Sequence, residues 1–251
     1  MKVPVYDLEG NVVKEVELPK AFREYIRTDV IRKAFRIFMM NNRQSYGPNP
    51  RAGKNIAAES WGVGYGLARI PRLPNGRGAF APNTVGGYRA HGPKPEKIWK
   101  RHINKKELRL ALRAALSATA IKELVASRGH RIPEDKTLPI VVTDDIEQIK
   151  KTKDLIKVLK NLGLEDDLER ASKKKIRAGI GKMRGRRYKR AKSVLIVVSK
   201  YDGIEKSASN IPGVEVSLVK QLNINKLAPG GTPGRLTIFT ESALKELEGW
   251  P

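Results

Sequence analysis

The chain contains no cysteine, which excludes thiol catalysis, disulfide bonds and cysteine-ligated zinc sites. It has only three histidines, and its 26 acidic residues are outnumbered by 50 lysines and arginines. No apolar run is long enough to span a bilayer, and the first residues turn polar too early for a signal peptide. We therefore expect a cytosolic protein.

The surplus of basic residues is the strongest signal in the composition. The net charge is +24 and the sequence pI is about 10.3. A field of this sign and size attracts polyanions, so nucleic acid is the first candidate partner and an anionic membrane surface the second. With 251 residues the chain can form one sizeable core with appendages.

Residues 43–106 follow neither a helical nor a strand period. They hold 10 of the 22 glycines and 7 of the 15 prolines, a density that forbids regular elements. They also hold 13 lysines and arginines against two acids, a local charge of +11, with six aromatic residues among the cations. A loop this long is usually functional or disordered, and linkers are poor in rings. The remaining alternative is a flexible basic excursion without a specific role.

Alternating cations and rings suit single-stranded or looped RNA, because Arg and Lys meet phosphates while planar groups stack on splayed bases. We expect this loop to bind RNA through Arg43, Arg51, Lys54, Trp61, Arg69, Arg72, Arg77, Arg89, His91, Lys94, Lys97, Trp99, Lys100, Arg101, His102 and Lys105.

The N-terminal residues predict a hairpin and a helix. Short strand-like runs at 3–6 and 12–16 indicate a hairpin that decorates an edge. Thr28 is the expected N-cap of a helix to about Asn41. Its apolar stripe comprises Val30, Ile31, Ala34, Phe35, Phe38 and Met39.

The second half of the chain predicts helices and buried strands in alternation. A capping box of Asn104 and Glu107 opens a helix to about Gly129, and a second box of Asp144 and Glu147 opens one through about Leu162. Thr240 is expected to cap a final helix. Continuous apolar runs predict strands at 138–142, 194–198, 214–219 and 236–239.

The predicted fold class is therefore α/β, with a mostly parallel sheet covered by helices on both faces and a long extended loop rich in Gly, Pro and Arg. Residues 1–42 and 107–251 would form the globular domain, and residues 43–106 the RNA-binding loop inserted in it. Right-handed crossovers would join the parallel strands.

A second basic block lies at 173–190 and contains no acid. Tyr188 and three glycines stand among its cations, which favours RNA or phosphate contact over a merely solvated face. The block comprises Lys173, Lys174, Lys175, Arg177, Lys182, Arg184, Arg186, Arg187, Lys189 and Arg190.

Signatures of catalysis or cofactor binding are weak. The glycines at 62–66 and 179–185 match the dinucleotide fingerprint poorly, and no strand precedes them; no phosphate-binding P-loop is present. The histidines lack metal-ligand spacing, so no metal or other cofactor is expected. The acidic pairs at 144–145 and 166–167 fall at helix starts, where carboxylates are favoured for electrostatic reasons.

Three segments carry a family resemblance. These are the run from Trp61 to Arg72 (WGVGYGLARIPR), the run from Trp99 to Asn104 (WKRHIN), and LAPGGTPGR at 227–235 followed by TESA. Together with Gly78-Ala79-Phe80 they resemble the universal ribosomal protein four of the large subunit, in its archaeal and eukaryotic form. The resemblance covers essentially the whole chain.

The resemblance implies an α/β domain on the large ribosomal subunit and a loop threaded into ribosomal RNA, with neighbouring ribosomal proteins as further partners. It also implies that the loop tip lines the constriction of the polypeptide exit tunnel and meets the nascent polypeptide. The corresponding tip residues are Gly62, Gly64, Tyr65, Gly66, Arg69 and Arg72.

The expected function is thus structural: the protein binds large-subunit rRNA, aids assembly and catalyses no reaction. Neither a membrane nor a small-molecule substrate is expected as a partner. The alternatives are an RNA-processing enzyme with a basic clamp and a general RNA-binding regulator.

Overall fold

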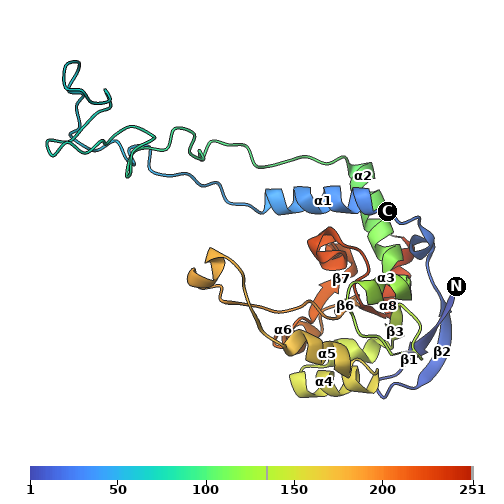
Figure 1. Ribbon diagram of the computed structural model, residues 1–251. Helices are drawn as coiled ribbons and strands as arrows, with labels where there is room; N and C mark the ends of the chain where they lie inside the picture. The colour runs from blue at the N-terminus through green and yellow to red at the C-terminus, as the bar shows by residue number, and fades with distance from the viewer. Residues whose placement is uncertain (134, 250–251) are drawn as a thin grey trace. The chain divides into compact units, whose positions relative to one another are not determined.

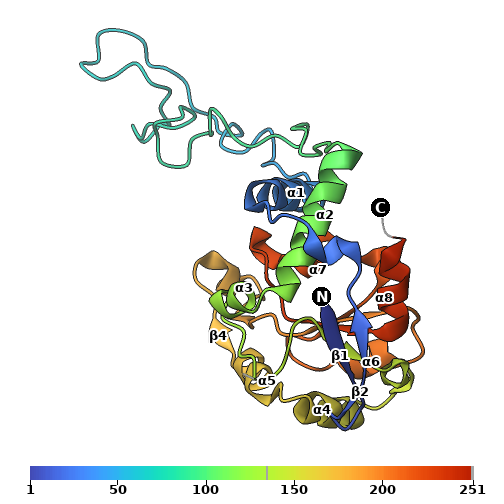
Figure 2. The ribbon, with the colours of Figure 1, turned by 90° about the vertical axis from the view of Figure 1, so that its right-hand side faces the viewer.

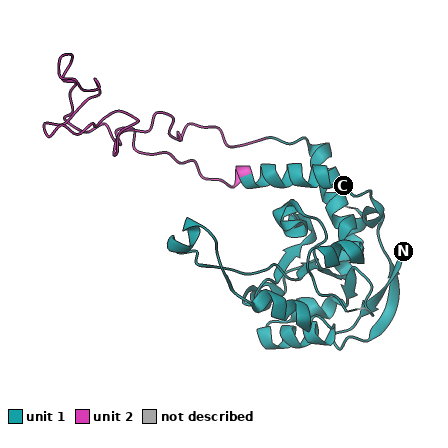
Figure 3. Cartoon of the chain, viewed as in Figure 1, with its two compact units in different colours: residues 1–39, 102–251 teal, residues 40–101 magenta. Residues whose placement is uncertain are grey.

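The computed structural model describes residues 1–133 and 135–249 and divides into two compact units. Unit 1 comprises residues 1–39 and 102–251, and unit 2 comprises residues 40–101 (Figure 3). Helix α1 (Thr28–Asn41) runs across the boundary. Beyond that helix, unit 2 consists of turns, bends, irregular backbone and isolated bridges.

Unit 1 is built on a six-stranded sheet with the order β2-β1-β3-β8-β6-β7. All neighbouring strands run parallel except β1 and β2, which pair antiparallel, so the predicted mostly parallel sheet is confirmed. The N-terminal hairpin extends this sheet, because β1 pairs directly with β3. The strands are β1 (Lys2–Tyr6), β2 (Val12–Glu17), β3 (Ile140–Val142), β6 (Leu195–Val198), β7 (Glu215–Leu218) and β8 (Thr237–Thr240).

Alternate side chains of the central strands enter two separate cores, since successive residues of a strand point to opposite faces. Val141, Leu195, Val197 and Phe239 belong to the first core. The second core takes their neighbours Ile140, Val142, Ile196, Val198 and Ile238. The central strands β3, β6 and β8 are therefore buried on both faces, which explains why they are continuous apolar runs.

Helices cover both faces, as predicted (Figure 1). Helices α1, α2, α7 and α8 supply buried residues to the first core, and α3, α4 and α6 supply them to the second. Figure 2 gives the view turned by 90°, with α8 and α4 both labelled beside the sheet. The remaining helices are α2 (Lys105–Ser117), α3 (Lys122–Ser127), α4 (Thr152–Asn161), α5 (Glu165–Ser172), α6 (Ile204–Ser209), α7 (Ile224–Leu227) and α8 (Glu241–Glu248). None of these described helices has the length and apolar character needed to cross a membrane.

Two helices expected to be continuous are interrupted. The helix predicted from Asn104 to Gly129 is broken by 3₁₀ residues 118–120 into α2 and α3, and the one predicted from Asp144 to Leu162 begins as a 3₁₀ turn before α4. The 3₁₀ segments are η1 (Lys20–Arg23), η2 (Ala118–Ala120), η3 (Asp144–Gln148), η4 (Ile180–Met183), η5 (Val219–Gln221) and η6 (Pro229–Gly231).

Neither predicted capping box forms. Asn104 occupies the N-cap of α2 but makes no side-chain cap hydrogen bond, and Glu107 pairs instead with Lys33 at 2.6 Å. The Glu147 carboxylate accepts hydrogen bonds from the Ser199 backbone N–H at 2.9 Å and from Thr240 Oγ1 at 2.8 Å. Distant partners thus replace the expected local ones.

The two other predicted helix features are mostly correct. Thr240 caps α8, since its Oγ1 accepts a hydrogen bond from the Ala243 N–H. Thr28, the predicted N-cap of α1, is instead its first residue, because the Ile31 N–H donates to the Arg27 carbonyl; this prediction is wrong by one residue. The predicted stripe of α1 packs into the first core except for Met39, which is half exposed.

Candidate nucleic-acid interface

The two ends of unit 2 are fastened to each other. The Arg101 backbone N–H donates to Asn41 Oδ1 at 2.9 Å. Further along, Glu59 and Arg72 exchange two backbone hydrogen bonds, and Arg72 also bridges to Gly78. The segment therefore follows a defined path although it contains no regular element beyond α1.

Planar groups from both ends of unit 2 stack on one another. The Tyr46 and Trp99 rings lie 6.2 Å apart at an interplanar angle of 14°. The Arg43 guanidinium carbon lies 3.9 Å from the Trp99 ring centroid, and Lys97 Nζ lies 4.7 Å from it. Such cation–π contacts hold the rings in place. Three of the predicted RNA-binding residues, Arg43, Lys97 and Trp99, thus form one cluster, and Tyr46 joins them.

A second ring cluster lies further along unit 2. Phe80 and Tyr88 meet edge to face with their centroids 5.6 Å apart, and Lys54 Nζ lies 5.2 Å from the Tyr88 centroid. The backbone beside this cluster is tight: a Cβ on Gly87 would lie 1.9 Å from the Ala81 carbonyl oxygen. Glycine is required at that position for this packing.

The predicted tip contains three glycines at positive φ, namely Gly62, Gly64 and Gly66, with open space around each. The Trp61 and Tyr65 rings lie 5.7 Å apart. Arg72 is only partly exposed, because its guanidinium donates to the Gly76 carbonyl at 2.8 Å and to the Ala68 carbonyl at 3.3 Å. Arg72 therefore serves the local structure, whereas Arg69 is exposed.

Most of the expected RNA-binding side chains are exposed. Arg72 and Trp99 are the two that are partly buried. His102 and Lys105 fall within unit 1, and the others lie in unit 2. The exposed members are Arg43, Arg51, Lys54, Trp61, Arg69, Arg77, Arg89, His91, Lys94, Lys97, Lys100, Arg101, His102 and Lys105.

Two buried donors of unit 2, Trp99 Nε1 and Arg72 Nε, have no hydrogen-bond partner in the described chain. A buried donor without an acceptor costs roughly 1–3 kcal/mol. A partner that supplies acceptor oxygens would remove that cost.

The second basic block forms a small hairpin. Strands β4 (Lys175–Ile176) and β5 (Tyr188–Lys189) pair antiparallel, with Ile176 opposite Tyr188 (Figure 2). The Arg177 guanidinium is bonded to the Arg186 and Tyr188 carbonyl oxygens, so it stabilises the hairpin itself. The other cations of the block, Lys173, Lys174, Lys175, Lys182, Arg184, Arg186, Arg187, Lys189 and Arg190, are exposed.

A buried cluster around Asp167 fixes both ends of this hairpin. Asp167 accepts hydrogen bonds from Arg170 Nε at 2.9 Å, from Ser193 Oγ at 2.5 Å and from the Arg131 backbone N–H at 3.1 Å. His130 Nδ1 lies 3.2 Å from the same carboxylate. Since Arg170 also donates to the Lys192 carbonyl at 2.7 Å, the residues before and after the hairpin are tied together.

The electrostatics of this cluster follow from burial and hydrogen bonding. Burial raises the pKa of the Asp167 carboxyl, but the hydrogen bonds from His130, Arg170 and Ser193 outweigh burial and hold this pKa well below its usual range. Burial lowers the pKa of His130 below its ordinary value of 6.5, and the attraction to Asp167 opposes that shift only in part. The folded protein therefore holds an ionised Asp167 beside a neutral His130.

Arg235 is the largest fully buried side chain. Its Nη1 donates to Glu215 Oε2 at 2.6 Å and to the Lys226 carbonyl at 2.8 Å, and its Nε donates to the Ser193 carbonyl at 3.1 Å. The sequence predicts neither the burial of Arg235 nor the role of Asp167. Asp166 and Asp167 are recognisable as acids at a helix start, but no local pattern indicates that Asp167 meets His130 and Ser193.

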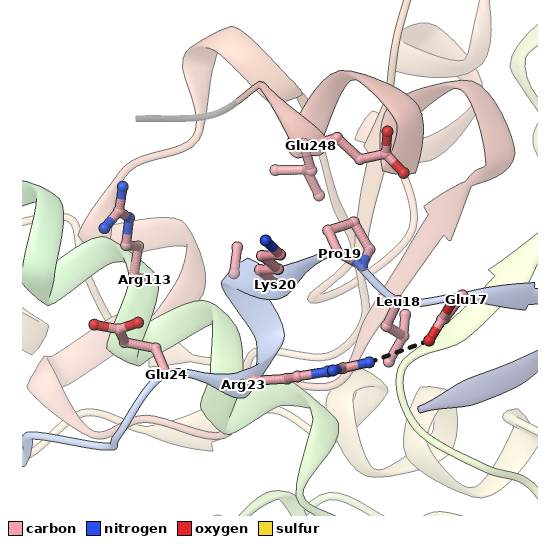
Figure 4. A pocket seen from close by; sticks show the side chains of 10 residues that line it. Glu17, Leu18, Pro19, Lys20, Arg23, Glu24, Arg113 and Glu248 are labelled. Atoms are coloured by element: carbon pink, nitrogen blue, oxygen red, sulfur yellow. Dashed lines mark hydrogen bonds and ion pairs between the residues drawn. The ribbon is translucent and has the colours of Figure 1, made fainter.

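One hollow of unit 1 lacks the usual hydroxyl nucleophiles and histidine base of an active site. One cavity of about 690 Å³ is lined by acids and bases that include Glu17, Arg23, Glu24, Arg113 and Glu248 (Figure 4). Arg23 pairs with Glu17 at 3.3 Å, and no serine, threonine or histidine lines this cavity. Among the described residues, no three His, Asp or Glu side chains gather in a way that could hold a metal ion.

Comparison with known proteins places these features in one family. The family model described as the ribosomal protein L4/L1 family matches residues 16–250. The large ribosomal subunit protein uL4 of Archaeoglobus fulgidus is 50% identical over 252 residues, which cover 100% of this chain and 99% of the relative. The uL4 proteins of Methanopyrus kandleri and Methanocaldococcus jannaschii are 49% and 47% identical, over 99% of this chain and 98% of each relative.

Proposed function

The chain belongs to the ribosomal protein L4/L1 family, and from that premise we propose how its parts serve the ribosome. It is a structural constituent of the large ribosomal subunit, of the archaeal type, and not an enzyme. It works in the cytoplasm, in a particle made of rRNA and other ribosomal proteins. Within that particle, unit 2 is the principal rRNA-binding element.

The observation that carries this proposal is the stacking of exposed cations on exposed and partly exposed rings in unit 2. Arg43, Tyr46 and Trp99 form one such cluster, and Lys54 and Tyr88 take part in another. Cations neutralise phosphates with release of counterions, and rings or guanidinium planes receive unpaired bases. Acceptors from RNA can also satisfy the buried donors Trp99 Nε1 and Arg72 Nε.

Unit 2 has few buried side chains of its own, Ala79 being the one fully buried hydrophobic residue. Such a segment gains little free energy from burying its own side chains and becomes ordered when it binds its partner. The conformational entropy lost on ordering then opposes part of the favourable free energy of binding. We expect unit 2 to be disordered in the free protein and fixed on rRNA.

The glycine-rich tip and the β4–β5 hairpin complete the proposal. The tip, with Gly62, Gly64, Tyr65, Gly66 and Arg69, lines the constriction of the exit tunnel and meets the nascent polypeptide. The hairpin is a second rRNA contact, because it presents exposed lysines and arginines and contains no acidic residue. Its buried anchor at Asp167 fixes where those cations point.

Limited proteolysis tests the role of unit 2. The free chain should be cut within residues 43–106, and the same bonds should resist cleavage once the chain is bound to large-subunit rRNA at near-physiological salt. Resistance in both states would show that the segment orders on its own and would contradict the proposal.

A deletion of residues 60–90 provides the matched variant. Unit 1 keeps both cores without these residues, so the circular dichroism of its helices and sheet should persist. The deleted protein should fail to enter large subunits stably. Normal incorporation would refute the proposal.

A further inference from the structure

Unit 2 contains a cavity of about 710 Å³ beside the Tyr46–Trp99 cluster. The side chains around it include Tyr46, Arg89, His91, Lys94, Glu96 and Lys97. Its volume falls within the range of about 300–1,000 Å³ that is usual for pockets holding small ligands. All of these residues belong to unit 2, so the cavity lies within one compact part of the chain.

One wall of this cavity is a fixed aromatic ring. Tyr46 is half exposed, while Trp99 stacks parallel to it and Arg43 Nη2 donates to its hydroxyl at 3.0 Å. Lys97 lies over Trp99 in turn. Once unit 2 is ordered on rRNA, these contacts hold the exposed surface of the Tyr46 ring in one orientation, in which a planar group can stack on it.

The rest of the lining has the charge of a phosphate-binding site. Arg89, Lys94 and Lys97 carry three formal positive charges, and His91 adds a ring nitrogen. Glu96 is the single acid among the lining residues and offers an acceptor for an amino or hydroxyl hydrogen. A planar wall, several cations and one acceptor match a nucleotide, with its base, phosphate and ribose.

We infer that this cavity receives a single unstacked nucleotide of the large-subunit rRNA, whose base stacks on Tyr46 while its phosphate lies among Arg89, Lys94 and Lys97. The inference rests on the proposed function and adds a particular binding site to it. The ring beside the cations favours RNA over an acidic protein segment, because such a segment would pair with the cations but would have no base to stack on Tyr46. Aromatic stacking contributes to RNA binding for every base type. The ring therefore determines where the base lies and does not select which base it is.

The test compares large subunits reconstituted from rRNA, the other ribosomal proteins and variants of this chain. Per-nucleotide reactivity toward a 2′-hydroxyl acylating reagent is read in each particle. Tyr46→Leu removes the ring and should raise the reactivity of one or two nucleotides several-fold. Tyr46→Phe keeps the ring and should not. Tyr25→Leu, at an exposed tyrosine of unit 1, is the matched control and should leave all reactivities unchanged.

A second variant tests whether Tyr46→Leu acts by removing the ring or by loosening unit 2 in general. Arg89→Gln combined with Lys94→Gln leaves the Tyr46–Trp99 stack intact and should expose the same nucleotides. Stacking on one ring supports roughly tenfold tighter binding, and two lost phosphate contacts also weaken binding. Both variants should therefore leave the particle more readily than the wild-type chain. Different nucleotides in the two variants, or equal effects of Tyr46→Leu and Tyr46→Phe, would overturn the inference.

Photocrosslinking identifies the occupant directly. With p-azidophenylalanine at position 46, crosslinks should form to the rRNA nucleotides found by the reactivity map, and crosslinks to protein alone would overturn the inference. Failure of the wild-type chain to enter the particle would instead refute the proposed function. Normal incorporation of Tyr46→Leu with unchanged reactivities would overturn the nucleotide site alone.

Discussion

Arg235 and Glu215 form an ion pair in which the guanidinium is fully buried, with Nη1 and Oε2 2.6 Å apart. The same guanidinium also donates hydrogen bonds to the backbone carbonyl oxygens of Ser193 and Lys226. Ser193, Glu215 and Arg235 come from the segments that begin β6, β7 and β8, and Lys226 belongs to α7. One side chain therefore joins the starts of three neighbouring strands to a helix.

Replacing this arginine should therefore destabilise unit 1. Arg235→Met leaves Glu215 Oε2 and several carbonyl oxygens without this donor, whereas Lys192 still pairs with Glu215 Oε1. Because Glu215 keeps that partner and is partly exposed, the loss should lie near the lower end of the range of about 3–5 kcal/mol that breaking a buried pair costs. Urea unfolding followed by circular dichroism measures the loss. Arg109→Met, at an exposed position of α2, should change the free energy of unfolding by less than about 0.5 kcal/mol. Similar losses in both variants would contradict the role of Arg235.

The stability of unit 1 should fall between pH 7.5 and 5.5 because of His130. Its pKa is lowered in the folded state by burial, so the unfolded chain takes up a proton first as the pH falls through the ordinary value of 6.5. Urea unfolding at each pH should show a free energy of unfolding that falls as the pH is lowered through this range.

His130→Asn should remove this pH dependence, because asparagine keeps a donor near Asp167 but does not titrate. Replacing His102, which is exposed, by asparagine serves as the control and should leave the wild-type dependence in place. An unchanged pH profile in His130→Asn would show that another group causes the loss.

Gly87→Ala should disrupt unit 2 and spare unit 1. The new Cβ would lie 1.9 Å from the Ala81 carbonyl oxygen and 2.6 Å from Thr84 Oγ1, so the backbone between these residues must move. We expect weaker protection of residues 43–106 from protease in the rRNA complex, with unchanged unfolding of unit 1. Gly249→Ala is the control, since its Cβ would approach the Glu246 carbonyl only to 3.9 Å.

The hairpin cations should contribute to the salt dependence of rRNA binding. Changing Lys182, Arg184 and Lys189 together to glutamine should reduce the slope of log K against log salt by roughly 2–3, because each lost phosphate contact removes about 0.7–0.9. The same change at Lys151, Lys153 and Lys157, exposed at and within α4, provides a control of equal charge. Equal slopes in the two triple variants would mean that only bulk charge matters.

At the tip, Arg69→Glu should impair subunit assembly or nascent-chain passage. Arg69 is the informative position, because Arg72 is bonded to backbone carbonyls and its replacement would also disturb the tip itself. Lys245→Glu, exposed on α8, reverses one charge far along the sequence and should have little effect. The readouts are the fraction of variant chain in large subunits and the rate of protein synthesis. An equal effect of both variants would contradict a particular role for Arg69.

Helix ends show where reasoning from the sequence stopped. Asn104 and Glu107 have the spacing of a capping box, yet Glu107 pairs with Lys33 from α1. Glu147 likewise binds the ends of β6 and β8. The spacing of residues along a helix indicates which local hydrogen bonds are possible, but a partner that tertiary contact brings close competes for the same carboxylate. This competition cannot be predicted from the spacing alone.

The sequence by itself determined the class of the fold and the nature of the partner. Continuous apolar runs favour strands that are buried on both faces. Glycine and proline predict no regular element in residues 43–106, which is correct except for Lys105 and Lys106, the first residues of α2. A charge of +24 attracts polyanions and so favours nucleic acid as the partner.

Only the tertiary structure decided the strand order, the burial of Arg235, the role of Asp167 as the anchor of the β4–β5 hairpin, and the cavity beside Tyr46. The physical reason is the same in each case. These features depend on which distant residues meet, and side-chain partners separated by dozens of residues leave no period or spacing in the chain.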